Sequence, residues 1–245
     1  MVPAEFRRSA IVHTLIGLVS DAHGNSLAFD RAIALLLAQG VQRLYFLGDA
    51  VGYVPSATVL ESLRRLGSQV QCIRGNHEAM LLEGQIDAAS ESVYQLEALR
   101  PRLTPTQMAM IASWPASRTE VINGQKMLLV HGSPTDPTYG YVYPDTDLAG
   151  FAPDADWVFM GNTHHPFIRE QAGTRYVNIG SCGLPRDDGR YGSVALLDTK
   201  ARSARILRFD ITAESREVLE QFPTVHPSVR DVYERRRPVV MGDIL

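Results

Sequence analysis

In the first third of the chain, short apolar runs alternate with segments in which apolar residues are spaced three or four positions apart. Short apolar runs occupy residues 11–20, 44–47 and 70–73. Between these runs, apolar residues recur three or four positions apart, as Phe29, Ile33 and Leu36 do. Short runs indicate buried strands, whereas the longer spacing indicates amphipathic helices. The pattern therefore predicts strand–helix units, with a helix capped by Asn25 or Ser26 and a second helix over 55–66 that proline opens.

The pattern changes to strands after about residue 115. Apolar or alternating runs occupy residues 118–122, 126–130, 157–160, 175–179, 193–197 and 205–209. Asn123-Gly124 separates the first two runs, and this dipeptide favours a tight hairpin turn. Strand–helix units followed by strands predict an α+β fold in which two mixed β-sheets pack together and helices flank them.

The segment over residues 86–114 has helical character and breaks at Pro101 and Pro105. Thr104 is placed to cap a helix that begins at Pro105. Because the segment carries no cluster of chemically active residues, we expect a cap-like layer that shapes access to a site. We expect one domain over 1–245 with a C-terminal tail around 220–245.

Composition limits the classes of function. The 245 residues are 45% hydrophobic and 21% charged, which suits one large globular domain. The formal net charge of −3 gives no general attraction to nucleic acid or to an anionic membrane, so neither is an expected partner. Two cysteines far apart, Cys72 and Cys182, are expected to be reduced, which suits a cytoplasmic protein.

Residues that bind metals follow five of the predicted strands. They occur in Asp21-Ala-His23, Gly48-Asp49, Gly75-Asn76-His77-Glu78, Val130-His131-Gly132 and Gly161-Asn162-Thr163-His164. Open α/β folds place ligands beyond the carboxyl ends of strands, and residues two apart in extended chain point to the same side. A lone Gly-Asp would usually be an ordinary turn, but a carboxylate of Asp49 shared by two ions explains why five such segments converge.

These five motifs, in this order, resemble the calcineurin-like metallophosphoesterases over roughly residues 15 to 198. Three further segments resemble the small bacterial and archaeal phosphodiesterase branch of that family. They are Val130-His131-Gly132-Ser133-Pro134, Asn178-x-Gly180-Ser181 and Leu184-Pro185-Arg186-Asp187. The resemblance implies a β-sandwich of two sheets flanked by helices, in agreement with the strand pattern.

The resemblance also implies two divalent transition-metal ions as cofactors. The first ion takes Asp21, His23, Asp49 and His164, and the second takes Asp49, Asn76, His131 and Asn162. Imidazole and carboxylate ligands suit Mn, Fe, Ni, Co or Zn, and the sequence does not choose among them. The family usually has Gly-His-x-His at the last motif, so Asn162 is a departure that weakens the expected second site.

The implied reaction is hydrolysis of a small phosphodiester by a hydroxide that bridges the two ions, with Asp49 and His77 as the catalytic residues. Two carboxylates against two divalent ions leave an excess of about two positive charges, which attracts phosphate. His77 either protonates the leaving oxygen or stabilises charge in the transition state. Its alternative role is a histidine at a helix start, bonded to Glu78.

Two features near these motifs have open roles. Arg186 either binds a phosphate oxygen with two donors or is a surface arginine paired with Asp187 or Asp188. The tyrosines of the loop after His131 either line a substrate groove or pack the loop; they are Tyr139, Tyr141 and Tyr143.

Two other functions compete with the phosphodiesterase. One is a metal-binding scaffold with little or no catalysis, which the presence of Asp49 and His77 disfavours. The other is a nuclease or nucleotidase, for which the acidic balance leaves only short or cyclic nucleotides. The expected partner is a small phosphorylated substrate, and the oligomeric state stays open.

Overall fold

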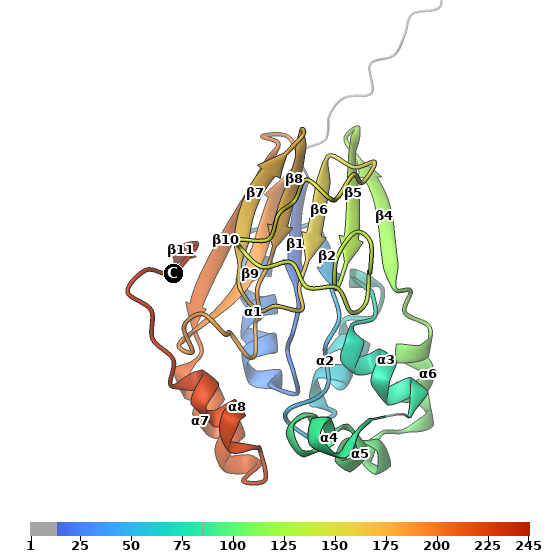
Figure 1. Ribbon diagram of the computed structural model, residues 1–245, viewed down its shortest axis with the longest axis vertical. Coiled ribbons are helices and arrows are strands. Elements are labelled where there is room, and N and C mark those ends of the chain that lie inside the picture. Colours follow the sequence, from blue (N-terminus) through green and yellow to red (C-terminus); the bar gives the residue numbers. More distant parts are fainter. Residues whose placement is uncertain (1–13, 85) are drawn as a thin grey trace, which may run out of the picture.

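The structure is a computed structural model that describes residues 14–84 and 86–245. Six strands form one sheet: β1 (Leu15–Val19), β2 (Arg43–Phe46), β3 (Val70–Cys72), β9 (Tyr191–Asp198), β10 (Ser203–Asp210) and β11 (Asp243–Ile244). Five strands form the other: β4 (Ser117–Ile122), β5 (Gln125–Val130), β6 (Trp157–Met160), β7 (Phe167–Gln171) and β8 (Thr174–Asn178). The strand orders are β11-β10-β9-β1-β2-β3 and β4-β5-β6-β8-β7 (Figure 1). Each sheet mixes parallel and antiparallel pairs, which confirms the predicted fold class.

The helices of the first half are α1 (Ser26–Ala38), α2 (Thr58–Leu66), α3 (Asn76–Glu83), α4 (Ala88–Tyr94), α5 (Leu96–Leu99) and α6 (Pro105–Ala112). Two short 3₁₀ turns occupy Gly67–Gln69 and Arg100–Arg102. Helices α7 (Thr212–Gln221) and α8 (Pro227–Tyr233) follow the last long strand. None of these helices, within the described residues, is long and apolar enough to cross a membrane.

Alternating residues of the first sheet build two layers of core. Ile16 and Leu18 of β1 pack against residues of the second sheet such as Met127 and Phe159. The opposite face of the first sheet packs on the helices, for example through Phe46. A one-residue shift of a strand would move each of its side chains to the opposite layer. Because burying a large apolar side chain contributes about 1.5–3 kcal/mol, losing the fit of both layers would be costly. The register of the strands, and with it the position of their ends, is therefore fixed by packing.

The observed helix starts agree with the cap residues that the sequence offers, with one exception. The side chain of Asn25 accepts a hydrogen bond from the Ala28 amide, and Thr104 caps α6 with Pro105 as its first residue. The second helix begins at Thr58, and its predicted start at Pro55 is wrong. The Ser56 hydroxyl binds the Thr58 amide at 3.3 Å, which holds 55–57 in a turn.

The C-terminal part of the chain contains more regular structure than its sequence indicated. Helices α7 and α8 occupy much of 212–233, and β11 pairs in parallel with β10 (Figure 1). Strand β7 was also not predicted; it pairs with β8 through a short turn. Residues 11–13 of the predicted first strand lie outside the described residues.

Candidate metal centre

The seven candidate ligands come together at one edge of the two sheets. Asp21 and His23 follow β1, Asp49 follows β2, Asn76 opens α3, His131 follows β5, and Asn162 and His164 follow β6. Strands β1, β2 and β3 are parallel to one another, as are β5 and β6, so their carboxyl ends meet at the same edge. All seven side chains are buried, which is costly for polar groups unless they bind one another or an ion.

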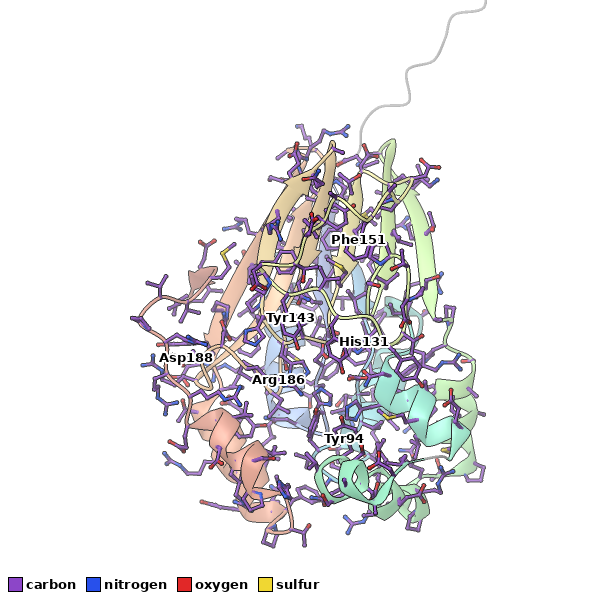
Figure 2. All side chains as sticks on the ribbon, viewed as in Figure 1. Tyr94, His131, Tyr143, Phe151, Arg186 and Asp188 are labelled. Carbon is purple, nitrogen blue, oxygen red and sulfur yellow. The ribbon has the colours of Figure 1, made fainter. Side chains whose placement is uncertain are left out.

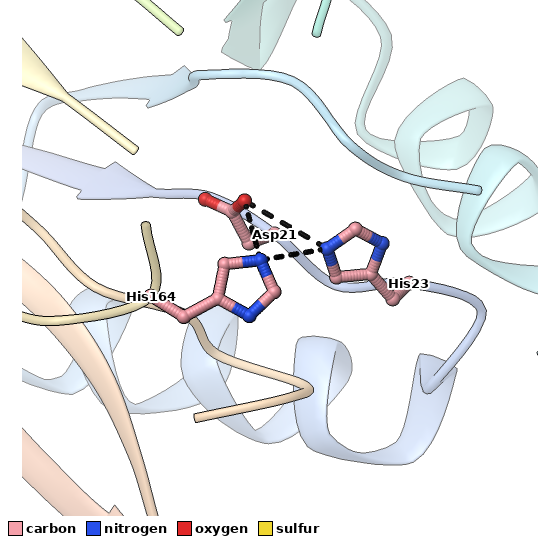
Figure 3. A group of neighbouring side chains, drawn as sticks. All are labelled: Asp21, His23 and His164. Atoms are coloured by element: carbon pink, nitrogen blue, oxygen red, sulfur yellow. Dashed lines mark hydrogen bonds and ion pairs between the residues drawn. The ribbon is translucent and has the colours of Figure 1, made fainter. Parts of the chain in front are cut away.

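One half of the ligand set consists of Asp21, His23 and His164 (Figure 3). The Nε2 atoms of the two histidines lie 3.0 Å apart. Nε2 of His164 lies 3.1 Å from Oδ1 of Asp21, and Nε2 of His23 lies 3.7 Å from the same oxygen. Two ring nitrogens and one carboxylate oxygen thus face a common point, which is a donor set suited to a divalent transition metal.

The other half is built around His131. Its Nε2 lies 2.9 Å from Oδ1 of Asn76 and 3.3 Å from Oδ2 of Asp49. The same Oδ2 atom of Asp49 lies 3.6 Å from Nε2 of His23, in the first half. Asp49 therefore stands between the two halves, where a ligand shared by two ions has to be.

Three backbone carbonyls orient the histidine rings. Nδ1 of His23 lies 3.1 Å from the Val51 carbonyl, and Nδ1 of His131 lies 2.7 Å from that of Leu47. Nδ1 of His164 lies 2.6 Å from the Leu184 carbonyl. Since a carbonyl only accepts, each Nδ1 carries a proton and donates, so the neutral form of each ring turns the lone pair of Nε2 toward the centre. The carbonyls thus fix the ring orientation that metal ligation needs.

Five candidate ligands have left-handed backbone conformations. Their φ angles lie between 49° and 64°, and they are Asp21, His23, Asp49, Asn162 and His164. Residues other than glycine adopt this region rarely, and such conformations concentrate where a site demands them. The local strain is consistent with loops shaped to point side chains inward.

The two carboxylates are ionised in this setting. Burial alone would raise the pKa of Asp21, but His164 and His131 hold it well below its usual value. Burial likewise opposes ionisation of Asp49, and His131 and His77 lower its pKa despite that. Although burial disfavours the charged form of His131, Asp49 and Asp21 raise its pKa to about 10. Because a metal binds neutral imidazole, binding an ion here would release this proton.

Glu78 holds the loop that carries Asp49. Its carboxylate accepts from the amides of Asp49 and Ala50 at 2.8 Å, Val51 at 3.2 Å and Gly75 at 2.9 Å. Burial raises the pKa of this group to about 7, and the four amide donors favour its charged form. Sequence reasoning treated Glu78 only as a neighbour of His77. The Gly-Asn-His-Glu motif was the available signal for its role.

His77 lies in an aromatic box beside Asp49. Its ring centroid is 4.9 Å from that of Tyr53, 4.6 Å from that of Tyr94 and 4.8 Å from that of His23. Nε2 lies 3.9 Å from Oδ2 of Asp49, and within the described residues Nδ1 has no hydrogen-bond partner. Burial lowers the pKa of His77 to about 3, so the ring is neutral at pH 7. His77 also lies close enough to His23 and Asp49 for the three side chains to hold one metal ion.

Asn162 is joined to the centre through its backbone. Its amide donates to both carboxylate oxygens of Asp21, at 3.2 and 3.3 Å. Its side-chain Nδ2 donates to the Gly140 carbonyl at 2.8 Å, which leaves Oδ1 as the atom available to an ion.

Arg186 points toward the ring of Tyr53. The alternative expectation, a surface ion pair with Asp187 or Asp188, is wrong. Nη2 of Arg186 lies 2.5 Å from the hydroxyl of Tyr53. Asp187 is bound instead by Arg208, at 2.6 and 3.0 Å, and Asp188 by Arg190, at 2.9 Å twice. Figure 2 shows Arg186, His131 and Tyr94 around the region where the strands end.

Comparison with known proteins decides the family. A model of the calcineurin-like phosphoesterase superfamily domain matches residues 15–202. The chain belongs to the calcineurin-like phosphoesterase superfamily. The chain is therefore a hydrolase of a family that cleaves phosphoesters with divalent metal ions, and its buried Asp and His clusters fit that cofactor.

Three similar proteins are consistent with this assignment. A probable metallophosphoesterase of Methanothermobacter thermautotrophicus is 27% identical over 200 residues, covering 79% of this chain and 92% of that protein. An uncharacterized protein of Methanocaldococcus jannaschii is 26% identical over 223 residues, covering 82% and 89%. The crystal structure of a metallophosphoesterase from Sphaerobacter thermophilus superposes with a TM-score of 0.74 at 21% identity, covering 91% and 99%, and shows the same fold.

Proposed function

We propose that this calcineurin-like phosphoesterase is a dinuclear metal-dependent phosphodiesterase that hydrolyses a small phosphodiester. The observation that carries the proposal is the position of Asp49. Its Oδ2 lies 3.3 Å from Nε2 of His131 and 3.6 Å from Nε2 of His23, between the two halves of the ligand set. A carboxylate so placed is suited to bridging two ions.

The chain's own residues have separate roles in this proposal. Two divalent ions, when bound, supply an activated water and neutralise charge on the phosphate. Asp21 and Asp49 are ionised and hold the ions, while Glu78 keeps the Asp49 loop in place through four amides. Arg186 binds a phosphate oxygen that the ions leave free, since guanidinium matches phosphate geometry.

His77 faces the leaving side of the phosphate in this proposal. With its pKa lowered to about 3 by burial, the neutral ring stabilises charge on the leaving oxygen by donating a hydrogen bond. This choice favours the second of the two roles expected for His77. His77 and Arg186 beside the ligand set also favour an enzyme over a metal-binding scaffold, because a scaffold needs neither.

Charge and thiol chemistry support the proposed substrate and location. A net charge of −3 favours a small substrate whose phosphate is drawn by the local charge of the loaded centre, and disfavours extended nucleic acid. Cys72 and Cys182 are free thiols, in keeping with a reducing cytoplasm.

Metal analysis combined with a substrate panel tests the proposal. The protein is stripped of metal, reloaded separately with Mn²⁺, Fe²⁺, Co²⁺, Ni²⁺ or Zn²⁺, and assayed on bis-p-nitrophenyl phosphate and p-nitrophenyl phosphate. We expect two ions per chain and faster cleavage of the diester. Faster cleavage of the monoester would contradict the diester specificity, and metal binding without cleavage of either compound would favour the scaffold.

A further inference from the structure

Three exposed tyrosines on one loop differ in what they face. Tyr139, Tyr141 and Tyr143 are 41%, 52% and 39% exposed, and the residue Val142 between the last two is buried. The hydroxyl of Tyr139 lies 3.4 Å from the carboxylate of Glu83, which draws its ring toward α3. The rings of Tyr141 and Tyr143 are nearly parallel, with centroids 6.1 Å apart.

The backbone on both sides of Tyr141 is held by contacts with Asn162 and with the second sheet. The carbonyl of the preceding residue, Gly140, accepts from the side chain of Asn162 at 2.8 Å. Val142, which follows, packs with Val130 and Met160 on the second sheet. These two contacts fix the backbone on both sides of Tyr141, so its exposed ring is held in a defined place.

Tyr141 lies beside the proposed phosphate site. Its stacking partner Tyr143 has a ring centroid 6.0 Å from that of His165, which follows the candidate ligand His164. Burial raises the pKa of Tyr141, and Tyr94 acts in the same direction while Arg186 acts against it. Figure 2 shows Tyr143, Arg186 and His131 in the same part of the view. The pKa of Tyr139, in contrast, is raised by burial and by Glu83.

Two more tyrosine rings, those of Tyr53 and Tyr94, lie beside His77. Tyr53 and Tyr94 have centroids 5.2 Å apart, and the amide of Tyr53 donates to the carbonyl of Tyr94 at 2.7 Å. The guanidinium carbon of Arg186 lies 5.8 Å from the centroid of the Tyr53 ring. The guanidinium of Arg186 is thus held against Tyr53, whose ring also contacts those of Tyr94 and His77.

We infer that Tyr53, Tyr94, Tyr141 and Arg186 form a substrate subsite for a phosphodiester that carries a planar aromatic group. This inference rests on the proposed function and adds the class of substrate. Arg186 binds the phosphate, and the exposed face of Tyr141 stacks on the aromatic group. Aromatic stacking of a base on a side chain changes affinity by roughly 5- to 150-fold, which is enough to select such an ester over an alkyl one.

Calorimetry on the metal-loaded protein tests this subsite with product-like ligands. Phenylphosphonate and methylphosphonate share the phosphonate and differ in the aromatic ring, so the ratio of their affinities isolates the subsite. We expect phenylphosphonate to bind about tenfold tighter. Tyr141→Ala should abolish this difference, whereas Tyr139→Ala, which removes another exposed tyrosine of the same loop, should preserve it.

A third ligand and a parallel assay complete the test. Thymidine 5′-phosphate binding tighter than phenylphosphonate would assign the subsite to a nucleoside ester, and equal or weaker binding would assign it to a simple aryl ester. Equal affinity for phenyl and methyl ligands, or a preference that survives Tyr141→Ala, would overturn the inference. Hydrolysis of bis-p-nitrophenyl phosphate is measured in parallel. Cleavage without an aromatic preference would remove only the subsite, and a preference without cleavage would remove only the proposed activity.

Discussion

The two halves of the ligand set differ in the chemistry of their donors. Around His23 and His164, two imidazoles and the carboxylate of Asp21 face one point, with 3.0 Å between the imidazole nitrogens. Around His131, one imidazole is accompanied by the amide of Asn76 at 2.9 Å, and we propose Asn162, whose Nδ2 donates to Gly140, as a further ligand of this half. One oxygen of Asp49, Oδ2, lies within 3.6 Å of an imidazole nitrogen in each half, whereas the carboxylate of Asp21 reaches Nε2 of His131 at 4.0 Å.

This difference implies unequal binding of two ions. Imidazole is a better ligand than an amide oxygen for later transition metals, whereas oxygen ligands suit harder ions. The half around His131 also holds a proton on its imidazole, which an ion must displace. We therefore expect the half around His23 and His164 to bind an ion first.

Asp49→Asn should have the largest effect, because it changes the carboxylate that lies between the two halves. We expect at least one ion to be lost and turnover to fall by more than roughly 100-fold, beyond the 10- to 100-fold typical of residues that only support a ligand. The amide keeps the size of the side chain, so circular dichroism should show a folded protein. Two ions with near wild-type turnover would contradict a shared ligand at this position.

His77→Ala should keep both ions and slow turnover by roughly 10²-fold or more, the scale of a lost catalytic donor. Diesters with leaving groups of low pKa should be affected least, because they need the least stabilisation. Metal content and a leaving-group series together check the prediction. A loss of metal would place His77 in the first half as a ligand, an arrangement that its distances to Asp49 also permit.

Glu78→Gln should reduce turnover by about 10- to 100-fold, as for other residues that orient ligands. The carboxylate accepts two amides on each oxygen, and an NH₂ group in place of one oxygen would face two donors. Glu83→Gln on the same helix, at an exposed position, is the matched control and should retain activity. A normal pattern of metal binding and turnover in Glu78→Gln would show that the Asp49 loop holds its shape without this anchor.

The sequence predicts the ligand set better than it predicts the surroundings of that set. Asp21 and His131 were found because a strand that ends in a ligand leaves a local mark, an apolar run followed by a polar residue. The neighbours of Arg186 leave no such mark, since Tyr53 and Arg208 lie far from it along the chain. Only the packing of the sheets shows that Asp187 is already paired with Arg208, which frees Arg186 for the site.

The same distinction applies to the fold. Strong periodicity located the central strands, whereas the start of α2 depended on the Ser56 hydroxyl and could not be placed from Pro55 alone. Strand β7 ends in Arg169-Glu170-Gln171, a polar run whose pairing with β8 comes from the hairpin and not from an apolar pattern. Local apolar patterns identify strands, whereas a strand with a polar end such as β7 depends on contacts made elsewhere in the chain.

Asn162→His should have the smallest effect on the protein and the sharpest effect on the asymmetry. Both side chains are neutral, so the attraction of the centre for phosphate is unchanged and turnover at saturating metal should change little. One coordination bond changes from an amide oxygen to an imidazole nitrogen, which favours the later transition metals.

We expect Asn162→His to bind its weaker ion more tightly, by about tenfold, and to shift its preference from Mn²⁺ toward Zn²⁺ or Ni²⁺, since imidazole gains most with the later metals. The variant also loses the hydrogen bond to the Gly140 carbonyl, so Asn162→Ala is the control that removes this bond without adding a ligand. Calorimetric titration of the three proteins with Mn²⁺ and Zn²⁺ measures the effect. Equal affinities and preferences in wild type, Asn162→His and Asn162→Ala would show that position 162 is not a ligand. The half around His131 would then be completed by another group, and the asymmetry would no longer rest on this residue.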